Sequence, residues 1–308
     1  MIRLSAFADE ISPDLPEQIA TLKRENIAHI DLRGAWNTNV LDLSDEQAIS
    51  IKESLEGHGI KVAAIGSPIG KVPVDSPFDE HLERFERAIK LAHLFGTSLV
   101  RIFSFYAPAG LSVLAGERPV GAGVVRCGAG TLGSPSLTPQ DADPADPDSW
   151  RDEVVWRLRE MIKRARAAGI TLIHENERGI YGDTIARCVD LLQECNDTHF
   201  QAVFDPANFI QCGQTPYPDA YEALRPWLHY MHVKDALPDG RVVAAGEGAA
   251  HWPELLQRLR QDSYDGFFSL EPHLVFAGTY QGFSGPELFR YASQALQQML
   301  QSMEWEYA

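Results

Sequence analysis

Strand-like and helix-like segments alternate along almost the whole chain, and this alternation limits the fold more than any other sequence feature. Short apolar runs rich in β-forming residues recur eight times, separated by amphipathic stretches. A strand, then a helix, then another strand is the pattern of a parallel sheet. Eight such units in 308 residues predict a single-domain (β/α)8 TIM barrel over residues 1–308.

Local signals predict where helices begin and which faces they bury. Ser12 followed by Pro13 predicts the start of the first helix, and Ser44 predicts the cap of the second. The closing helix is expected to bury one side, made of Leu288, Tyr291, Ala292, Ala295, Met299 and Met303.

One segment, residues 107–148, interrupts the alternation after the fourth strand. It contains seven Gly and six Pro and has no period of either 2 or 3.6 residues. We expect a flexible insert within the barrel domain. A surface insertion without function and a lid over the mouth of the barrel both fit, because a loop that follows a strand emerges on the catalytic face.

The last four strand-like runs, TLIHE, QAVFD, HYMHV and FFSLE, each end on or near a side chain that can bind a metal ion. These side chains are Glu175, Asp205, His232 and Glu271. The carboxyl ends of barrel strands meet on one face, so we expect the four to converge. Three carboxylates and one imidazole suit one divalent ion, Mn, Mg or Co and less well Zn. One carboxylate after a strand is usually a cap, but four in a row favour a metal site.

Other polar residues lie at or near predicted strand ends. Arg33 and Arg101 could bind phosphate or hydroxyl groups of a substrate, or brace the barrel through ion pairs. Glu10 could contact substrate or a neighbouring Arg. Lys234, which follows the predicted His ligand by two residues, is expected to contact substrate.

The charge balance argues against a nucleic-acid partner. The 27 Lys and Arg residues are outnumbered by 43 Asp and Glu, and the net charge of −16 repels a phosphate backbone.

No apolar run approaches the ~18 residues that span a bilayer, and the start MIRLSAFADEIS lacks a signal-peptide core. The four Cys form no C-x-x-C pair, which favours reduced thiols. We expect a cytoplasmic protein without membrane partners, and a homo-oligomer is compatible with the barrel.

Several motifs resemble those of a known family. They are AFADEIS, IDLRG, IGSPIGK, RIFSFY, HENERGIYGDT, VFDPANF, MHVKDA and LEPHL. In these motifs the chain resembles the xylose isomerase-like barrels of the sugar-phosphate isomerase and epimerase group, over nearly all residues outside 107–148. The resemblance implies that the four strand-end residues occupy the family's metal-binding positions. Ketose 3-epimerases of this group carry a His where this chain has Asn208, which we include among the substrate-binding candidates.

With this resemblance, we predict a metal-dependent isomerase or epimerase of a small sugar, keto-sugar or sugar phosphate. Glu175 and Glu271 come from different strands, so one could take a proton beside a carbonyl while the other returns one to the opposite face of an enediolate. The alternatives are an inosose dehydratase-like enzyme, in which Lys234 or another acid assists the leaving hydroxyl, and a non-catalytic sugar-binding barrel. Aromatic residues that could stack on a sugar ring, or simply pack, are Trp36, Phe105 and Tyr106.

Overall fold

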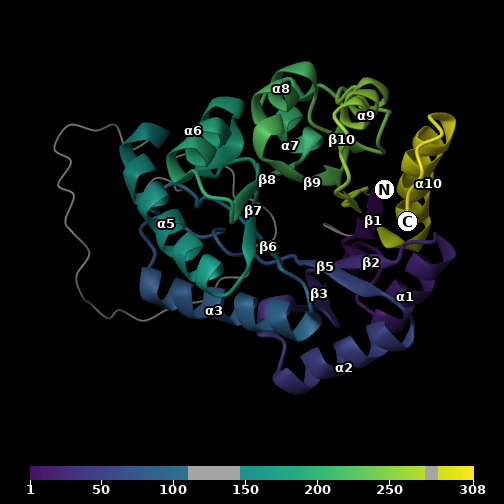
Figure 1. The fold of residues 1–308 in the computed structure, drawn as a ribbon, viewed down its shortest axis with the longest axis horizontal. Coiled ribbons are helices and arrows are strands. Elements are labelled where there is room, and N and C mark those ends of the chain that lie inside the picture. Colours follow the sequence, from purple (N-terminus) through teal and green to yellow (C-terminus); the bar gives the residue numbers. More distant parts are fainter. Residues whose placement is uncertain (110–145, 275–283) are drawn as a thin grey trace.

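Eight parallel strands form a nearly closed barrel surrounded by helices (Figure 1). The computed structural model describes residues 1–109, 146–274 and 284–308. Hydrogen-bonded neighbours run in the order β1-β12-β9-β8-β7-β6-β5-β2, so the strands follow one another around the barrel in chain order. Their bounds are β1 Arg3–Ala6, β2 His29–Leu32, β5 Lys61–Ile65, β6 Leu99–Ile102, β7 Thr171–Glu175, β8 Phe200–Phe204, β9 Leu228–Val233 and β12 Phe267–Leu270. The predicted (β/α)8 architecture is confirmed.

Helices pack around the outside of the barrel and connect successive strands (Figure 1). Their bounds are α1 Leu15–Arg24, α2 Asp45–Gly57, α3 Phe78–Phe95, α5 Arg151–Ala167, α6 Ile185–Cys195, α7 Pro206–Gln211, α8 Tyr221–Leu224, α9 Trp252–Gln261 and α10 Gly285–Ser302. Two short hairpins extend from the barrel, β3 Gly34–Ala35 with β4 Thr38–Asn39 and β10 Asp235–Ala236 with β11 Val242–Val243. Within the described ranges, no helix combines the length and hydropathy needed to cross a lipid bilayer.

The chain closes on itself beside β1. The backbone N–H of Leu4 donates to the carbonyl of Ala308 at 2.8 Å, and that of Ala308 donates to Ile2 at 3.1 Å. Figure 1 shows both termini next to β1 and α10. The last residues therefore cover the strand at which the barrel closes.

The barrel interior is packed below the carboxyl ends of the strands. Its apolar side chains are Ala63, Ala64, Leu99, Ile173, Val203, Tyr230 and Phe267. Ile173 and Tyr230 lie two residues before Glu175 and His232 on the same strands, so each pair points to the same side. Because side chains fill the barrel beneath the site, a substrate can react only at the carboxyl ends of the strands.

Two of the predicted helix features differ from the structure. The first helix begins at Leu15 and is capped by Asp14, not Ser12; Ser12 instead accepts a hydrogen bond from the backbone of Asp14 at 3.1 Å. In α10, Tyr291 is 50% exposed. The residues that α10 buries are Phe289, Ala292, Ser293, Leu296 and Leu300. Of the predicted face, Ala292 is buried and Leu288, Ala295, Met299 and Met303 are partly buried against the core, so the prediction was wrong only at Tyr291.

The predicted insert at 107–148 falls mostly outside the described residues, which omit 110–145. Its flexibility and its role as a lid or a simple insertion stay predictions. After the gap, a 3₁₀ turn at Pro147–Trp150 leads directly into α5. Free thiols are present at Cys188, Cys195 and Cys212, and Cys127 lies outside the described ranges.

We expect Ser44→Ala to lower the free energy of unfolding by about 1 kcal/mol, because it removes the cap of α2. Ser44 Oγ accepts from the backbone N–H of Gln47 at 3.2 Å, and the Gln47 side chain accepts from the backbone of Ser44, which forms a capping box. Urea denaturation measures the change. The control is Ser54→Ala in the same helix, expected within about 0.5 kcal/mol of the wild type. Equal losses from both variants would contradict the capping role.

Candidate metal centre

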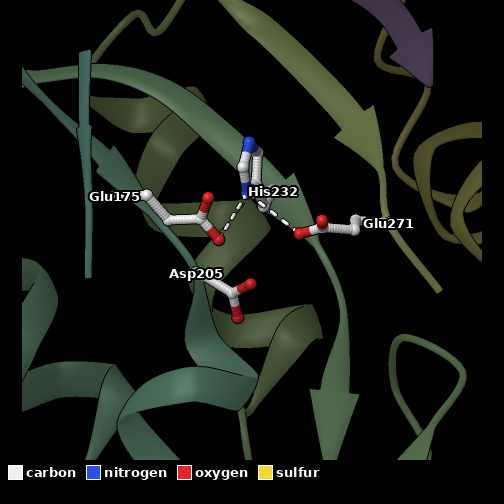
Figure 2. A group of neighbouring side chains, drawn as sticks. All are labelled: Glu175, Asp205, His232 and Glu271. Atoms are coloured by element: carbon white, nitrogen blue, oxygen red, sulfur yellow. Dashed lines mark ion pairs between the residues drawn. The ribbon is translucent and has the colours of Figure 1, made fainter. Parts of the chain in front are cut away.

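Four polar side chains meet at the carboxyl ends of β7, β8, β9 and β12. Glu175 is the last residue of β7, Asp205 follows β8, His232 lies near the end of β9, and Glu271 follows β12. Figure 2 shows His232 between the two glutamates, with Asp205 beside them. Donor atoms of all four lie within 4.8 Å of one another, and no residue of the four is more than 2% exposed. The structure thus brings the predicted ligands together.

Several of these donor atoms have no hydrogen-bond partner among the described residues. His232 Nδ1 lies 3.1 Å from Glu175 Oε1 and 3.3 Å from Glu271 Oε2, close enough for ion pairs. Within the described part of the chain, however, both His232 ring nitrogens, Asp205 Oδ2 and Glu271 Oε2 have no partner in hydrogen-bond geometry. Buried polar atoms rarely stay unsatisfied. Three carboxylates and one imidazole, held close together with few well-formed hydrogen bonds, therefore fit an oxygen-rich divalent metal site.

Two buried cations, Lys234 and Arg101, pair with the same carboxylates. Lys234 Nζ lies 2.7 Å from Asp205 Oδ2 and 3.5 Å from Glu271 Oε2. Arg101 Nη1 lies 3.0 Å from Glu175 Oε2 and 3.5 Å from Glu271 Oε1. For Arg101, bracing through ion pairs is therefore the observed arrangement. Lys234 is in the site, where its predicted contact with substrate stays a prediction.

Arg33 and Glu10 link the first two strands to Glu271. Arg33 donates from Nε to Asp9 at 2.7 Å, from Nη2 to Glu10 at 3.0 Å and from Nη1 to Glu271 at 2.8 Å. Glu10 also lies 2.8 Å from His273 Nε2. Glu10, Glu271 and His273 are thus a second set of close donors. Because Arg33 pairs with both carboxylates, an ion-pair network accounts for that set.

Asn208 lies at the start of α7 and contacts two of the predicted ligands. Its backbone N–H donates to Asp205 Oδ1 at 2.9 Å, and its Nδ2 lies 3.3 Å from Glu175 Oε1. The side chain of Asn176 exchanges two hydrogen bonds of 2.9 Å with the backbone of Asp205. Asn176 was missed in the sequence, although an amide directly after a predicted ligand is the signal that could have found it. Both amides fix the orientation of ligand-bearing strand ends.

The charges around the site keep both glutamates ionised. Burial alone would raise the pKa of Glu175, but His232 and Arg101 lower it to about 2. At Glu271 burial is likewise outweighed, and Lys234 and His273 hold the pKa well below its usual range. Ionised carboxylates at neutral pH are in the form that accepts a proton.

The pKa values of Asp205 and His232 are both raised, but for different reasons. Burial is the largest influence on Asp205 and raises its pKa, although Lys234 opposes it. Burial lowers the pKa of His232, but Glu175 and Glu271 raise it to about 10. Without a bound cation, His232 therefore holds a proton at neutral pH.

The three aromatic candidates for sugar stacking have different surroundings. Phe105 is fully buried in the core, so packing accounts for it. The hydroxyl of Tyr106 lies 3.5 Å from Glu177. Trp36 is 37% exposed in the turn between β3 and β4. Trp36 is thus the most accessible of the three.

The sequence profile of the family described as "xylose isomerase-like TIM barrel" matches residues 21–305. D-psicose 3-epimerase of Enterocloster bolteae is 26% identical over 132 residues, which are 42% of this chain and 42% of that protein. The match thus spans less than half the length of this curated relative.

Two solved structures share the fold over nearly the whole chain. The probable 3-DHS dehydratase AsbF of Bacillus anthracis is 18% identical with a TM-score of 0.66, covering 96% of this chain and 99% of that one. A xylose isomerase-like TIM barrel protein of Mycobacterium smegmatis, solved in complex with magnesium, is 17% identical with a TM-score of 0.67, covering 98% and 97%. By its profile match and its fold, the chain belongs to the xylose isomerase-like TIM barrel family.

Proposed function

We propose that the protein is a divalent-metal-dependent isomerase or epimerase of a small sugar or keto-sugar. One observation carries the proposal: four buried metal-type donors converge within 4.8 Å at the carboxyl ends of the strands, and among the described residues Asp205, His232 and Glu271 each keep an atom without a hydrogen-bond partner. Similarity to a D-psicose 3-epimerase supports the reaction class. We infer that Glu175, Asp205, His232 and Glu271 hold the ion, with Mn, Mg or Co favoured by the oxygen-rich set.

The two glutamates supply the proton chemistry in this proposal. They reach the site from β7 and β12, on two sides of His232 (Figure 2). A substrate carbon between them has a carboxylate on each face. One glutamate, as the carboxylate, removes the proton beside the carbonyl, and the other, in its carboxylic acid form, delivers a proton to the opposite face, which inverts the centre. Return of the proton to the neighbouring carbon isomerises the sugar instead.

The surrounding residues of the chain prepare these carboxylates. Arg101 contacts and orients both glutamates, and it helps to lower the pKa of Glu175. Within the described residues, Glu271 Oε2 has no hydrogen-bond partner, although it lies 3.3 Å from His232 Nδ1 and 3.5 Å from Lys234 Nζ. A divalent cation, when bound, would supply charge neutralisation for the oxygens of an enediolate. The near-complete burial of the four ligands excludes water, which strengthens every charge interaction in the site.

A dehydratase is the second candidate, and Lys234 is the observation that favours it. Burial lowers the pKa of its ammonium, but Asp205 and Glu271 raise it above its usual value. Lys234 therefore carries a proton at 2.7 Å from Asp205 and could donate it to a leaving β-hydroxyl. The structural similarity to the probable dehydratase AsbF is consistent with this alternative.

A panel of ketoses, aldoses and keto-polyols in deuterated water, with added Mn, Mg or Co, tests the proposal. We expect metal-stimulated incorporation of deuterium at the inverted or newly protonated carbon. Loss of water from the substrate would favour the dehydratase. Binding of a sugar without exchange or turnover on any compound would contradict both enzyme proposals and favour a sugar-binding barrel.

The net charge of −16 supports a small molecule as partner rather than nucleic acid. Cytoplasmic location and homo-oligomerisation stay predictions.

A further inference from the structure

A pocket of about 270 Å³ is linked to the metal centre through Arg33. Arg33 lines the pocket, while its Nη1 donates to Glu271 Oε1 at 2.8 Å. The β3–β4 hairpin forms another wall, with Asn37, Thr38 and Asn39 in the lining. This volume is close to the lower end of the range for small-molecule sites, about 300–1,000 Å³. It therefore suits a group the size of a single ring.

The lining of the pocket offers no unpaired cation. Every donor nitrogen of Arg33 points to a carboxylate, that of Asp9, Glu10 or Glu271. Asp9, the other charged lining residue, pairs with Arg33 through Oδ2, while its buried Oδ1 has no hydrogen-bond partner among the described residues and can accept from a hydroxyl. A phosphate would have to displace a carboxylate from Arg33, whereas a neutral ligand would not. The pocket is therefore suited to an uncharged group.

The hairpin presents unused polar groups of the kind that bind hydroxyls. Asn37 is exposed, and neither its side-chain amide nor the Nδ2 of Asn39 bonds to another group in the described part of the chain. Asn39 Oδ1 is occupied, because it accepts from the backbone N–H of Leu41 at 3.0 Å. Thr38 donates to the carbonyl of Trp36 at 3.4 Å and keeps its acceptor capacity. Two amides and a hydroxyl match a polyhydroxy ligand.

The hairpin is held in one conformation. Trp36 and Asn37, its two central residues, have φ of +53° and +57°, the pattern of a type I′ turn. The backbone N–H of Trp36 donates to the carbonyl of Pro13 at 2.6 Å, which ties the turn to the loop before α1. A tryptophan in the left-handed region is strained, and such outliers gather at ligand sites. An exposed indole next to Asn37 in the chain offers a face for a sugar ring.

We propose that this pocket binds a neutral sugar ring joined by a glycosidic bond to the ring that reacts at the metal centre. The substrate class is then a glycosylated ketose or keto-sugar, rather than a free monosaccharide or a sugar phosphate. The inference rests on the proposed function, because it assigns the reacting ring to the metal centre. It adds Asn37, Thr38 and Asn39 as residues that determine specificity.

The experiment compares four probes in deuterated water with the metal-loaded protein: D-fructose, D-fructose 6-phosphate, and the ketose disaccharides lactulose and isomaltulose. We expect kcat/KM for deuterium exchange to be about tenfold or more higher for at least one disaccharide than for D-fructose, as one or two added hydrogen bonds would give. In the double variant Asn37→Gly with Asn39→Asp, this ratio should fall to about one. Glycine keeps the left-handed turn, and aspartate keeps the acceptor that caps Leu41.

Asn26→Gly is the matched control, since Asn26 also has a positive φ, of +56°, and lies outside the pocket. It should retain the wild-type preference. Three results would overturn the pocket assignment while leaving the proposed function intact. They are equal kcat/KM for D-fructose and both disaccharides, a disaccharide preference that survives in the double variant, and a preference for the phosphate ester.

Calorimetry separates the two proposals when no probe exchanges deuterium. If a disaccharide then binds the wild type about tenfold more tightly than the double variant, the pocket assignment stands and the proposed function fails. If neither exchange nor this difference in binding is found, both fail.

Discussion

Glu175→Gln and Glu271→Gln are each expected to lower turnover by about a thousandfold or more, on any substrate that the wild type converts. Each change removes a base and also one negative charge from the metal-type donor set. Steady-state kinetics with saturating metal gives the rates. Glu177→Gln is the control, because Glu177 pairs with Lys71 outside the four-residue centre. Its turnover should stay within a few-fold of the wild type.

Proton exchange separates the roles of the two glutamates, which rate alone cannot do. With bases on opposite faces, a variant that lacks one should still wash solvent deuterium into the substrate through the other, without forming the epimer. Metal content of each variant is measured in parallel, so that loss of the ion is not mistaken for loss of a base. Inversion with full retention of the original hydrogen would contradict a two-base mechanism. Near wild-type rates in both variants would leave these carboxylates as structural groups only.

The barrel and the four-residue centre could be predicted because both follow from local patterns. Apolar runs give the strands, and a parallel barrel collects whatever follows their carboxyl ends, so Glu175 and Asp205 needed no long-range information. The roles of Arg33 and Asn176 could not be predicted in this way. Arg33 lies 238 residues from Glu271 in the chain, and only the closed barrel brings its guanidinium to that carboxylate.

Local helix signals failed where two alternatives are close in the sequence. Ser12 and Asp14 are both good caps, and Ser12 binds the backbone of Asp14 instead of starting the helix. In α10 apolar residues occur on more than one side, so periodicity alone did not separate Phe289 from Tyr291. Packing against the barrel decides which of them is buried. The β3–β4 pocket could not be predicted from the sequence either, because strands of only two residues are too short to show a periodic pattern.

The double variant His232→Ala with Asp205→Ala should lose its bound metal. We expect about one divalent ion per chain in the wild type after dialysis, and an affinity at least about a hundredfold weaker in the variant. Elemental analysis and calorimetry with Mn²⁺ measure both. The control is His58→Ala with Asp79→Ala, which removes the same chemical groups from the exposed surface. Unchanged metal content in the His232 and Asp205 variant would mean that the ion binds elsewhere.

The same centre predicts that the affinity of the wild type for Mn²⁺ rises with pH. Burial lowers the pKa of His232, but Glu175 and Glu271 raise it from 6.5 to about 10, so the metal-free protein holds a proton there at neutral pH. This proton stabilises the metal-free fold fully below pH 6.5, and its contribution is lost as the pH rises through about 10. A cation that takes the imidazole must release the proton, so affinity should increase by up to about tenfold per pH unit between pH 6.5 and 8.5. Calorimetry in buffers of different ionisation enthalpy counts the protons released. Affinity independent of pH, with no proton release, would show that His232 is not a ligand.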